Sequence, residues 1–267
     1  MSELVSYNGD LLPVTAARIA AASAAALYGR GIFTTVAIID SKPFLLEKHW
    51  RRLTENAAKI WLDISKISEN RLRNELTGLL KMGSISEGRA RITLFDGTPT
   101  DLWPFPSERR TSVLILAAGK RKVPDNLRLG ISPFRINSDS PMAGVKSCNY
   151  LEKIIALEEA KKRGFNEAIQ LNERGHIVSA CMANVFWLWG GGLFTPSLKT
   201  GCLAGTTRGF VLENVDCTEI EAGLEALQNA DAIFLTSAGL GIVRVDEFEG
   251  RKLGGEHHPI LGLIPRG

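Results

Sequence analysis

The sequence predicts an α+β fold in two domains, and three patterns support this prediction. Apolar residues recur at helical spacing in two stretches of the N-terminal half, 47–61 and 68–82. Runs rich in β-branched residues, separated by turn residues, surround these stretches and fill much of the remaining chain. The polar and basic stretch 120–126 is the best candidate for a linker. We therefore expect a small α+β domain over residues 1–119 and a larger domain over 120–267.

The chain should begin with two hairpins joined by an alanine-rich segment. Asn8-Gly9 is a strong turn signal between 4–7 and 11–13. Residues 15–26 have helical propensity, although tertiary packing can override it. Residues 32–39 are rich in β-branched side chains, and 44–46 should return alongside them after a turn.

Two amphipathic helices and two strands complete the expected N-terminal domain. In the first helix, 47–61, Arg52 lies next to the apolar face. The second helix, 68–82, should end at Gly83. The strands are expected at 90–95 and 112–117, separated by a proline-rich loop that contains Trp103, Pro104 and Pro106.

The larger domain should be mostly strands with a few helices. A helix is expected over 150–163, with Leu151, Ile154 and Ile155 on its inner face and Leu157 at the margin. Further helices are expected at 206–214 and 220–229. Strands are expected at 127–134, 167–171, 176–181, 184–189, 193–195, 232–235 and 242–246.

Bulk composition indicates a soluble globular protein, and a small anionic substrate fits it better than a nucleic acid. The chain has 267 residues, 45% of them hydrophobic, and a net charge of +3 with basic and acidic residues interspersed, which disfavours a nucleic-acid surface. No signal peptide is evident and no apolar run is long enough to span a membrane, so we expect a cytoplasmic protein. The cysteines and histidines show no ligand spacing, so we expect reduced thiols and no metal.

Lys146 is the leading candidate for the chemistry. It stands among small and apolar residues just before the helix expected at 150–163. A lysine acts as a covalent catalyst when its amine loses a proton near neutral pH, and desolvation by Met142, Val145 and Cys148 would favour that loss. From these residues alone, a solvated surface lysine is the commoner alternative.

Five blocks in one order resemble the fold-type IV pyridoxal-phosphate (PLP) enzymes, the family of branched-chain and D-amino-acid aminotransferases and aminodeoxychorismate lyase. The blocks are YGRGIFTT (28–35), HWRRL (49–53), GVK (144–146) followed by Asn149, ANVF (183–186) and GTTR (205–208). The lyase subgroup is the most similar, because SPFR (132–135) precedes AGVK (143–146) at its spacing. The resemblance implies a larger domain that is barrel-like with flanking helices, and Lys146 as the Schiff-base lysine.

The resemblance also implies the other cofactor-binding residues. Thr206 and Thr207, at the start of a helix, would bind the PLP phosphate together with Arg52. Taken alone, Thr206 is more often a plain helix cap and Arg52 more often a solvated helix arginine. Ser237 and Ala238 match a second phosphate-binding turn of the family.

Ser179 marks a departure from the family. Relatives usually carry a glutamate five positions before the asparagine of the ANVF block, and it keeps the pyridine nitrogen protonated. Here that position is Ser179, and a shift of one residue gives Ala180, so neither alignment supplies a carboxylate. A hydroxyl weakens the electron sink that transamination needs, whereas an elimination that forms an aromatic ring suffers less.

The expected function is that of an aminodeoxychorismate lyase-like enzyme of folate synthesis, which eliminates pyruvate to give 4-aminobenzoate. The substrate would be a small anionic amino-acid-like molecule, and Arg30 and Arg135 are candidates to bind its carboxylates, with Arg91 as a third. A D-amino-acid or branched-chain aminotransferase is the alternative enzyme. The missing glutamate leaves open a PLP-binding homologue with impaired catalysis. The family generally forms homodimers, so we expect a homodimer.

Overall fold

The structure is a computed structural model that describes residues 3–100, 109–254 and 258–264. Contacts divide the chain into two compact units, Met1–Arg121 with Val145–Asn149, and Lys122–Gly144 with Tyr150–Arg266. The short segment that carries Lys146 therefore belongs to the first unit. The division into a small domain over residues 1–119 and a larger domain over 120–267 stays a prediction. The proline-rich loop with Trp103, Pro104 and Pro106 lies outside the described residues.

In the first unit, the described residues form one antiparallel sheet with the strand order β2-β1-β6-β5-β3-β4. Its strands are β1 (Leu4–Tyr7), β2 (Asp10–Pro13), β3 (Gly31–Ile39), β4 (Lys42–Pro43), β5 (Gly88–Asp96) and β6 (Thr111–Ala118). The first hairpin turns at Asn8 and Gly9, both with positive φ, as the turn signal predicts. The second hairpin is also present, but its return strand is short because α2 begins at Leu46.

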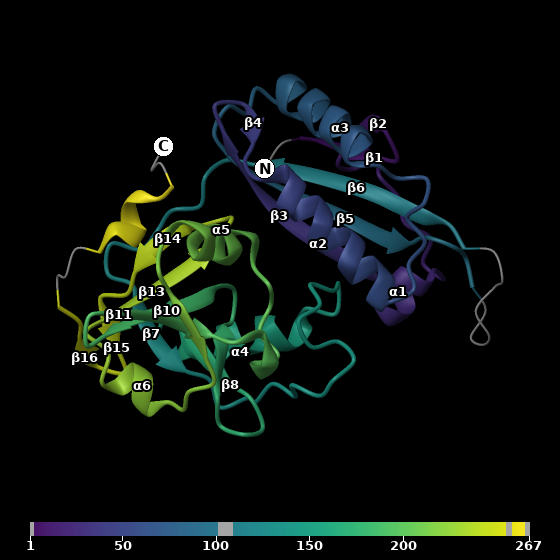
Figure 1. Ribbon diagram of the computed structural model, residues 1–267. Coiled ribbons are helices and arrows are strands. Elements are labelled where there is room, and N and C mark those ends of the chain that lie inside the picture. The colour runs from purple at the N-terminus through teal and green to yellow at the C-terminus, as the bar shows by residue number, and fades with distance from the viewer. Residues whose placement is uncertain (1–2, 101–108, 255–257, 265–267) are drawn as a thin grey trace. The chain divides into compact units, whose positions relative to one another are not determined.

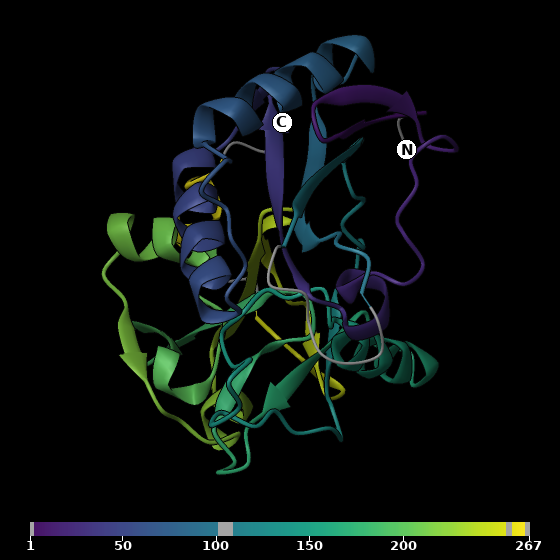
Figure 2. The same ribbon diagram turned by 90° about the vertical axis from the view of Figure 1, so that its right-hand side faces the viewer.

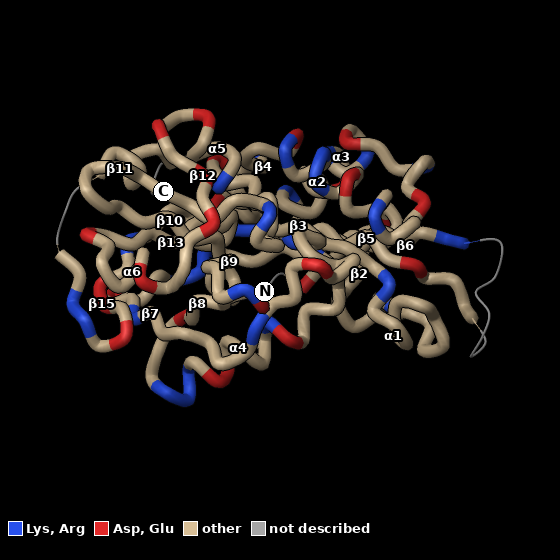
Figure 3. The backbone as a smooth tube through the Cα atoms, turned by 60° about the horizontal axis from the view of Figure 1, so that its bottom comes forward, with Lys and Arg blue, Asp and Glu red and all other residues tan. Residues whose placement is uncertain are grey.

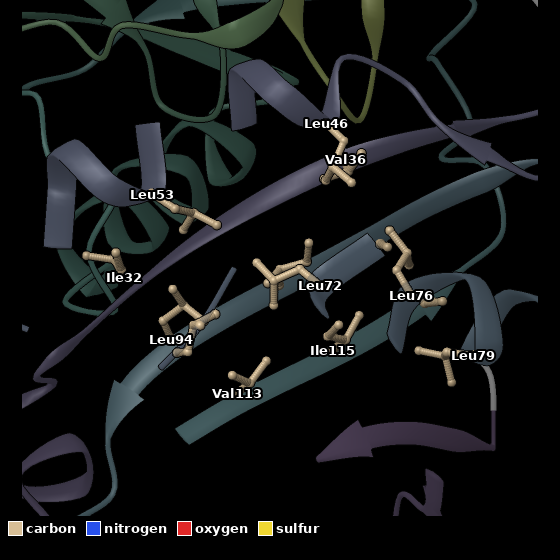
Figure 4. Packing of buried hydrophobic residues seen from close by; sticks show 14 of the residues in the cluster. Ile32, Val36, Leu46, Leu53, Leu72, Leu76, Leu79, Leu94, Val113 and Ile115 are labelled. Atoms are coloured by element: carbon tan, nitrogen blue, oxygen red, sulfur yellow. The ribbon is translucent and has the colours of Figure 1, made fainter. Parts of the chain in front are cut away.

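Two helices cover one face of this sheet and bury the first core. They are α2 (Leu46–Lys59) and α3 (Glu69–Met82), close to the ranges predicted from their 3.6-residue period. Figures 1 and 2 show both helices on the same side of the sheet. Leu53 from α2 and Leu72, Leu76 and Leu79 from α3 pack onto Ile115 and other sheet residues (Figure 4).

The alanine-rich segment is mostly irregular. Only α1 (Ala24–Tyr28) is helical; the Ser23 side chain accepts a hydrogen bond from Ala26 N at its start, and Gly29 ends it with φ +62°. The helical propensity of residues 15–26 is therefore overridden over most of its length. The described helix begins only after Ser23, whose side chain caps it.

In the second unit, as far as the chain is described, two five-stranded sheets enclose a shared core. Their strand orders are β12-β11-β10-β13-β14 and β16-β15-β7-β8-β9. Leu129 and Ile169 from the second of these sheets share one hydrophobic cluster with Val185, Trp187 and Ile233 from the first. The strands are β7 (Arg128–Ile131), β8 (Glu167–Leu171), β9 (Ile177–Ala180), β10 (Asn184–Trp189), β11 (Gly192–Pro196), β12 (Thr218–Ile220), β13 (Ala232–Ser237), β14 (Gly241–Arg244), β15 (Glu247–Phe248) and β16 (Arg251–Lys252).

The helices of the second unit are α4 (Leu151–Lys162), α5 (Thr206–Asn214) and the single turn α6 (Glu225–Gln228), with 3₁₀ turns at Leu198–Thr200 and Pro259–Gly262. The helix expected at 220–229 is wrong over its first half. Ile220 ends β12, which pairs in parallel with β11, so the backbone there is committed to the sheet. The helix expected at 206–214 is confirmed.

The inner face expected for α4 is also wrong. Leu151, Ile154 and Ile155 are exposed, by 65%, 40% and 44%. The buried face consists of Ala156, Leu157 and Ala160, which pack with Ala168 and Cys181. Small side chains let the helix approach the sheet closely, so the larger aliphatic residues point outward.

Charged residues are distributed along both units. Figure 3 shows lysine and arginine interspersed with aspartate and glutamate in both units, among a majority of other residues. None of the described helices has the length and apolar character needed to span a membrane.

Candidate active site

The Lys146 segment lies along the beginning of β3. Phe33 N donates to Lys146 O over 2.9 Å, Cys148 N donates to Gly31 O over 2.8 Å, and Ser147 forms a bridge with Ile32. Through these contacts, residues 146–148 run alongside β3 as a short extended segment. The Lys146 backbone is therefore fixed by the sheet of the first unit.

Helix α2 holds the same segment from the other side. Asn56 Oδ1 accepts a hydrogen bond of 2.8 Å from Lys146 N. Asn56 and Arg52 are one helical turn apart, and both are buried, at 5% and 7% exposure. One face of α2 thus presents Arg52 and fixes the backbone of Lys146. Asn56 was not predicted as a site residue. Its position one helical turn after Arg52, beside the apolar face of the predicted helix, could have indicated it.

Arg52 belongs to a buried polar network. Its guanidinium donates to Thr34 Oγ1 over 2.7 Å, and Thr34 Oγ1 lies 2.6 Å from His49 Nδ1. Because arginine only donates, the Thr34 oxygen accepts from Arg52, and the same hydroxyl shares a hydrogen bond with His49 Nδ1. Burial, with the positive charges of Arg52 and Lys146, lowers the pKa of His49 well below its ordinary value. His49 is therefore neutral at pH 7.

Two cationic side chains of the first unit contact the ring of Phe33. The Lys146 Nζ lies 4.5 Å from the centroid of the Phe33 ring, and the Arg91 guanidinium carbon lies 3.6 Å from it. Arg91 Nε also donates to Thr93 Oγ1 over 3.2 Å. Stacking on an aromatic face positions a guanidinium while leaving its N–H groups directed outward. Arg91, the third substrate-binding candidate from the sequence, is thus close to the proposed reactive amine.

Arg30 has a different environment. Its Nε lies 3.5 Å from the buried Asp96 carboxylate, and a terminal nitrogen donates to Ile60 O and Trp61 O. These contacts connect the C-terminal end of α2 to β5. The predicted role of Arg30 in substrate binding stays a prediction.

In the second unit, Thr206 and Thr207 form the first turn of α5 and are buried. Gly205 precedes them as the N-cap and contributes no side-chain cap. The first N–H groups of a helix lack intrahelical acceptors and lie at the positive end of its dipole. Asn184, from the ANVF block, donates to Leu203 O over 2.9 Å and so fixes the loop that leads into this turn.

Gly205 is required by this packing, which gives a testable prediction. A Cβ at Gly205 would lie 2.0 Å from Asn184 Oδ1. Gly205→Ala should lower the free energy of unfolding by about 1–3 kcal/mol, because Asn184 or the helix start must move. Gly209→Ala is the matched control, since it lies in the same helix with no atom near a new Cβ. It should be neutral or stabilising in urea unfolding, and equal losses in both variants would contradict the steric argument.

The second predicted phosphate turn follows β13. Ser237 Oγ accepts a hydrogen bond of 3.2 Å from Leu240 N, so Ser237 and Ala238 begin a tight turn. The neighbouring Thr236 is 1% exposed, and within the described residues its hydroxyl has no hydrogen-bond partner. Thr236 lies opposite Asn184 in the sheet. The roles of Ser237 and Ala238 in phosphate binding stay predictions.

Ser179 lies in β9, directly opposite Gln170 in β8, and is 7% exposed. Glu173, a nearby glutamate in sequence, is engaged elsewhere. It accepts from Ser138 N over 2.8 Å and from Ser138 Oγ over 2.6 Å, and these bonds lower its pKa to about 2. The Glu173 carboxylate is therefore committed to Ser138.

Arg135 lies in another part of the second unit. It donates to Asn172 O over 3.3 Å and lines an open pocket of about 880 Å³ with Arg174, His176, Trp187 and Trp189. Its predicted role as a substrate-binding residue stays a prediction. Within the described residues, no group of three histidine, cysteine, aspartate or glutamate side chains could hold a metal ion.

Comparison with known proteins identifies the family. Residues 31–248 match the family model of class IV aminotransferases, and the chain belongs to that family. It is 30% identical over 250 residues to the aminodeoxychorismate lyase of Bacillus subtilis strain 168, covering 89% of this chain and 85% of the relative. Its fold is that of fold-type IV enzymes.

Two solved structures define the similarity in fold. A branched-chain aminotransferase from Thermoproteus uzoniensis with norvaline superposes with a TM-score of 0.89 at 26% identity, covering 97% of this chain and 91% of that one. The 4-amino-4-deoxychorismate lyase of Pseudomonas aeruginosa gives a TM-score of 0.83 at 24% identity, covering 97% and 96%. The second likeness concerns the fold alone.

Class IV aminotransferases use PLP, and this chain is a PLP-dependent enzyme of that family. The residues present fit such a cofactor. The first unit offers a lysine on an aromatic ring and a buried arginine on the helix that fixes the lysine backbone. The second unit offers an uncapped helix start, and its packing excludes any side chain at Gly205.

Proposed function

We propose that this protein is a lyase that removes pyruvate from 4-amino-4-deoxychorismate and leaves 4-aminobenzoate, as in folate synthesis. The observation that carries the proposal is Ser179, a hydroxyl where relatives place a carboxylate, with Glu173 held by Ser138 instead. A pyridine ring without a proton on its nitrogen is a weak electron sink. An elimination that creates an aromatic ring depends less on that sink, because aromatisation itself stabilises the product.

Lys146 carries the covalent and proton-transfer roles in this proposal. Bound PLP supplies the electron sink for carbanion chemistry. Lys146 would hold the cofactor through its amine, and the same amine would take the proton from the substrate α-carbon and return a proton to the departing pyruvate group. Arg52 binds the phosphate as a bidentate cation, and the N–H groups and hydroxyls of Thr206 and Thr207 complete the set of donors.

Arg91 is proposed to bind a substrate carboxylate. Replacing it with glutamine removes a charge-assisted pair of about 1.5–3 kcal/mol. Arg91→Gln should therefore raise KM by roughly 10- to 100-fold, with a smaller change in kcat. Arg89→Gln is the matched control, because Arg89 lies two residues earlier on β5 and donates to Gly119 O instead. An unchanged KM in Arg91→Gln, measured by steady-state kinetics, would remove Arg91 from the proposal.

Two assays of the purified holoenzyme test the function. Incubation with aminodeoxychorismate should release pyruvate and 4-aminobenzoate in equal amounts. Separate incubations pair D-alanine or a branched-chain amino acid with a keto acid and are scored for amino transfer. Amino transfer without 4-aminobenzoate formation would replace the lyase with an aminotransferase. Silence in all assays, with cofactor bound, would leave a binding homologue of impaired activity.

The same proposal includes a homodimer that works in the cytoplasm. The exposed aliphatic face of α4, formed by Leu151, Ile154 and Ile155, supports an interface between copies of the chain. Light scattering on the purified protein should give twice the mass of one chain. A monomeric mass at micromolar concentration would contradict the dimer.

A further inference from the structure

Two adjacent strands of the second unit place two polar side chains side by side. Gln170 of β8 and Ser179 of β9 are directly opposite in the antiparallel register and are 3% and 7% exposed. Residues opposite each other share one face of a sheet, with Cβ atoms about 5 Å apart. Within the described residues, neither the Ser179 hydroxyl nor the Gln170 amide nitrogen makes a hydrogen bond.

Lys153 of α4 fixes the orientation of Gln170. Its Nζ lies 2.6 Å from Gln170 Oε1. The Lys153 amine is the donor in this hydrogen bond, so the oxygen of the amide faces Lys153. The NH₂ group of Gln170 therefore points away from Lys153 and can donate to an acceptor on its other side.

Glu167 and Cys181 belong to the electrostatic environment of Lys153. Glu167 accepts a hydrogen bond of 3.2 Å from Met182 N, and Cys181 Sγ donates to Ala168 O over 3.4 Å. Burial lowers the pKa of Lys153, which Cys181, Glu167, Glu152 and Cys202 partly oppose. Burial raises the pKa of Cys181 to about 12, so it remains a neutral thiol. Neither of these two hydrogen bonds involves Ser179 or Gln170.

We propose that Gln170 is a second cofactor-contacting residue beside Ser179, oriented by Lys153, and that its amide NH₂ group donates to the pyridine nitrogen. This inference rests on the proposed function, which assigns Ser179 to that nitrogen. An amide NH₂ group only donates, so it can bind an unprotonated pyridine nitrogen, which is an acceptor, but not a protonated one. The Ser179 hydroxyl can donate or accept and is compatible with this pairing. Gln170 therefore binds the ring in its uncharged form, and Lys153 acts as a positioning residue through Gln170.

The test uses full-length protein reconstituted with PLP labelled with ¹⁵N in the ring. Borohydride reduction and peptide mapping first establish attachment at Lys146. The ¹⁵N chemical shift of the bound ring, a readout independent of activity, then reports protonation and hydrogen bonding. The variants are Gln170→Leu and Lys153→Met, with Lys153→Arg as the conservative rescue and Lys161→Met, at the exposed end of the same helix, as the control. Thermal unfolding checks that each variant folds.

The wild-type shift should be that of an unprotonated, hydrogen-bonded pyridine. Gln170→Leu and Lys153→Met should move it toward the value of a free pyridine and weaken PLP binding by roughly 3- to 10-fold, the effect of one neutral hydrogen bond. Lys153→Arg and Lys161→Met should keep the wild-type shift. A protonated wild-type ring, or unchanged shifts in Gln170→Leu and Lys153→Met with PLP on Lys146, overturns this inference alone. Absence of PLP at Lys146 overturns it together with the proposed function.

Discussion

Lys146→Ala should fold normally but form no borohydride-reducible adduct with PLP, and its turnover should fall by at least roughly 10³-fold. The structure predicts normal folding because Lys146 is held through its backbone. Its N–H donates to Asn56 Oδ1 and its carbonyl accepts from Phe33 N, and an alanine keeps both bonds. The lost amine is the group that attaches the cofactor and transfers the proton. Mass spectrometry after reduction and a pyruvate-release assay measure the two effects.

Lys59→Ala is the control for this experiment. Lys59 is an exposed lysine at the end of α2, so its loss removes a positive charge from the same unit without altering the site. It should retain both the adduct and the activity. If Lys146→Ala still yields a reduced adduct, another lysine carries the cofactor. If the adduct disappears and turnover persists, the covalent role of Lys146 is wrong.

The elements predicted well from the sequence are those whose pattern had a single physical meaning. The 3.6-residue period of α2 and α3 required one sheet-facing stripe, and the structure buries that stripe. In α4 the apolar residues suggested an inner face, but alanines pack against β8 and β9. Hydropathy alone cannot distinguish a face that packs closely from a face that is left exposed. The helix expected at 220–229 was wrong at its start for another reason, because Ile220 belongs to β12, a strand that depends on pairing with β11.

The site was predictable in its residue types and not in its contacts. Lys146 and Arg52 came from a family resemblance. The hydrogen bond from Lys146 N to Asn56 joins positions 90 residues apart, and no local pattern encodes it. The sequence placed Lys153 only within the helix expected at 150–163. Its bond to Gln170 could not be predicted, because it depends on how α4 packs on β8. Long-range pairs of this kind explain why the resemblance gave the chemistry and the structure gave the supporting groups.

Arg52→Gln should weaken PLP binding by at least roughly 30-fold, because truncating one partner of a buried, hydrogen-bonded charge pair costs about 2–5 kcal/mol. Arg52 is 7% exposed, and its bond to Thr34 Oγ1 fixes the direction of the guanidinium. Arg52→Lys retains the charge but loses the planar pair of donors, so its affinity for PLP should lie between those of the wild type and Arg52→Gln. The dissociation constant of PLP, followed by absorbance on titration of apoprotein, measures the effect.

Arg51→Gln separates this role from a general effect of charge. Arg51 precedes Arg52 on α2 but is exposed, so its removal lowers the net charge equally without touching the network of Thr34 and His49. It should bind PLP like the wild type. The free energy of PLP binding lost in Arg52→Gln should also exceed any loss in the free energy of unfolding, because the hydrogen bond between Thr34 Oγ1 and His49 Nδ1 does not involve Arg52. Equal dissociation constants for Arg51→Gln and Arg52→Gln would show that the phosphate is bound elsewhere, and would leave Arg52 as a structural residue of the α2 and β3 packing.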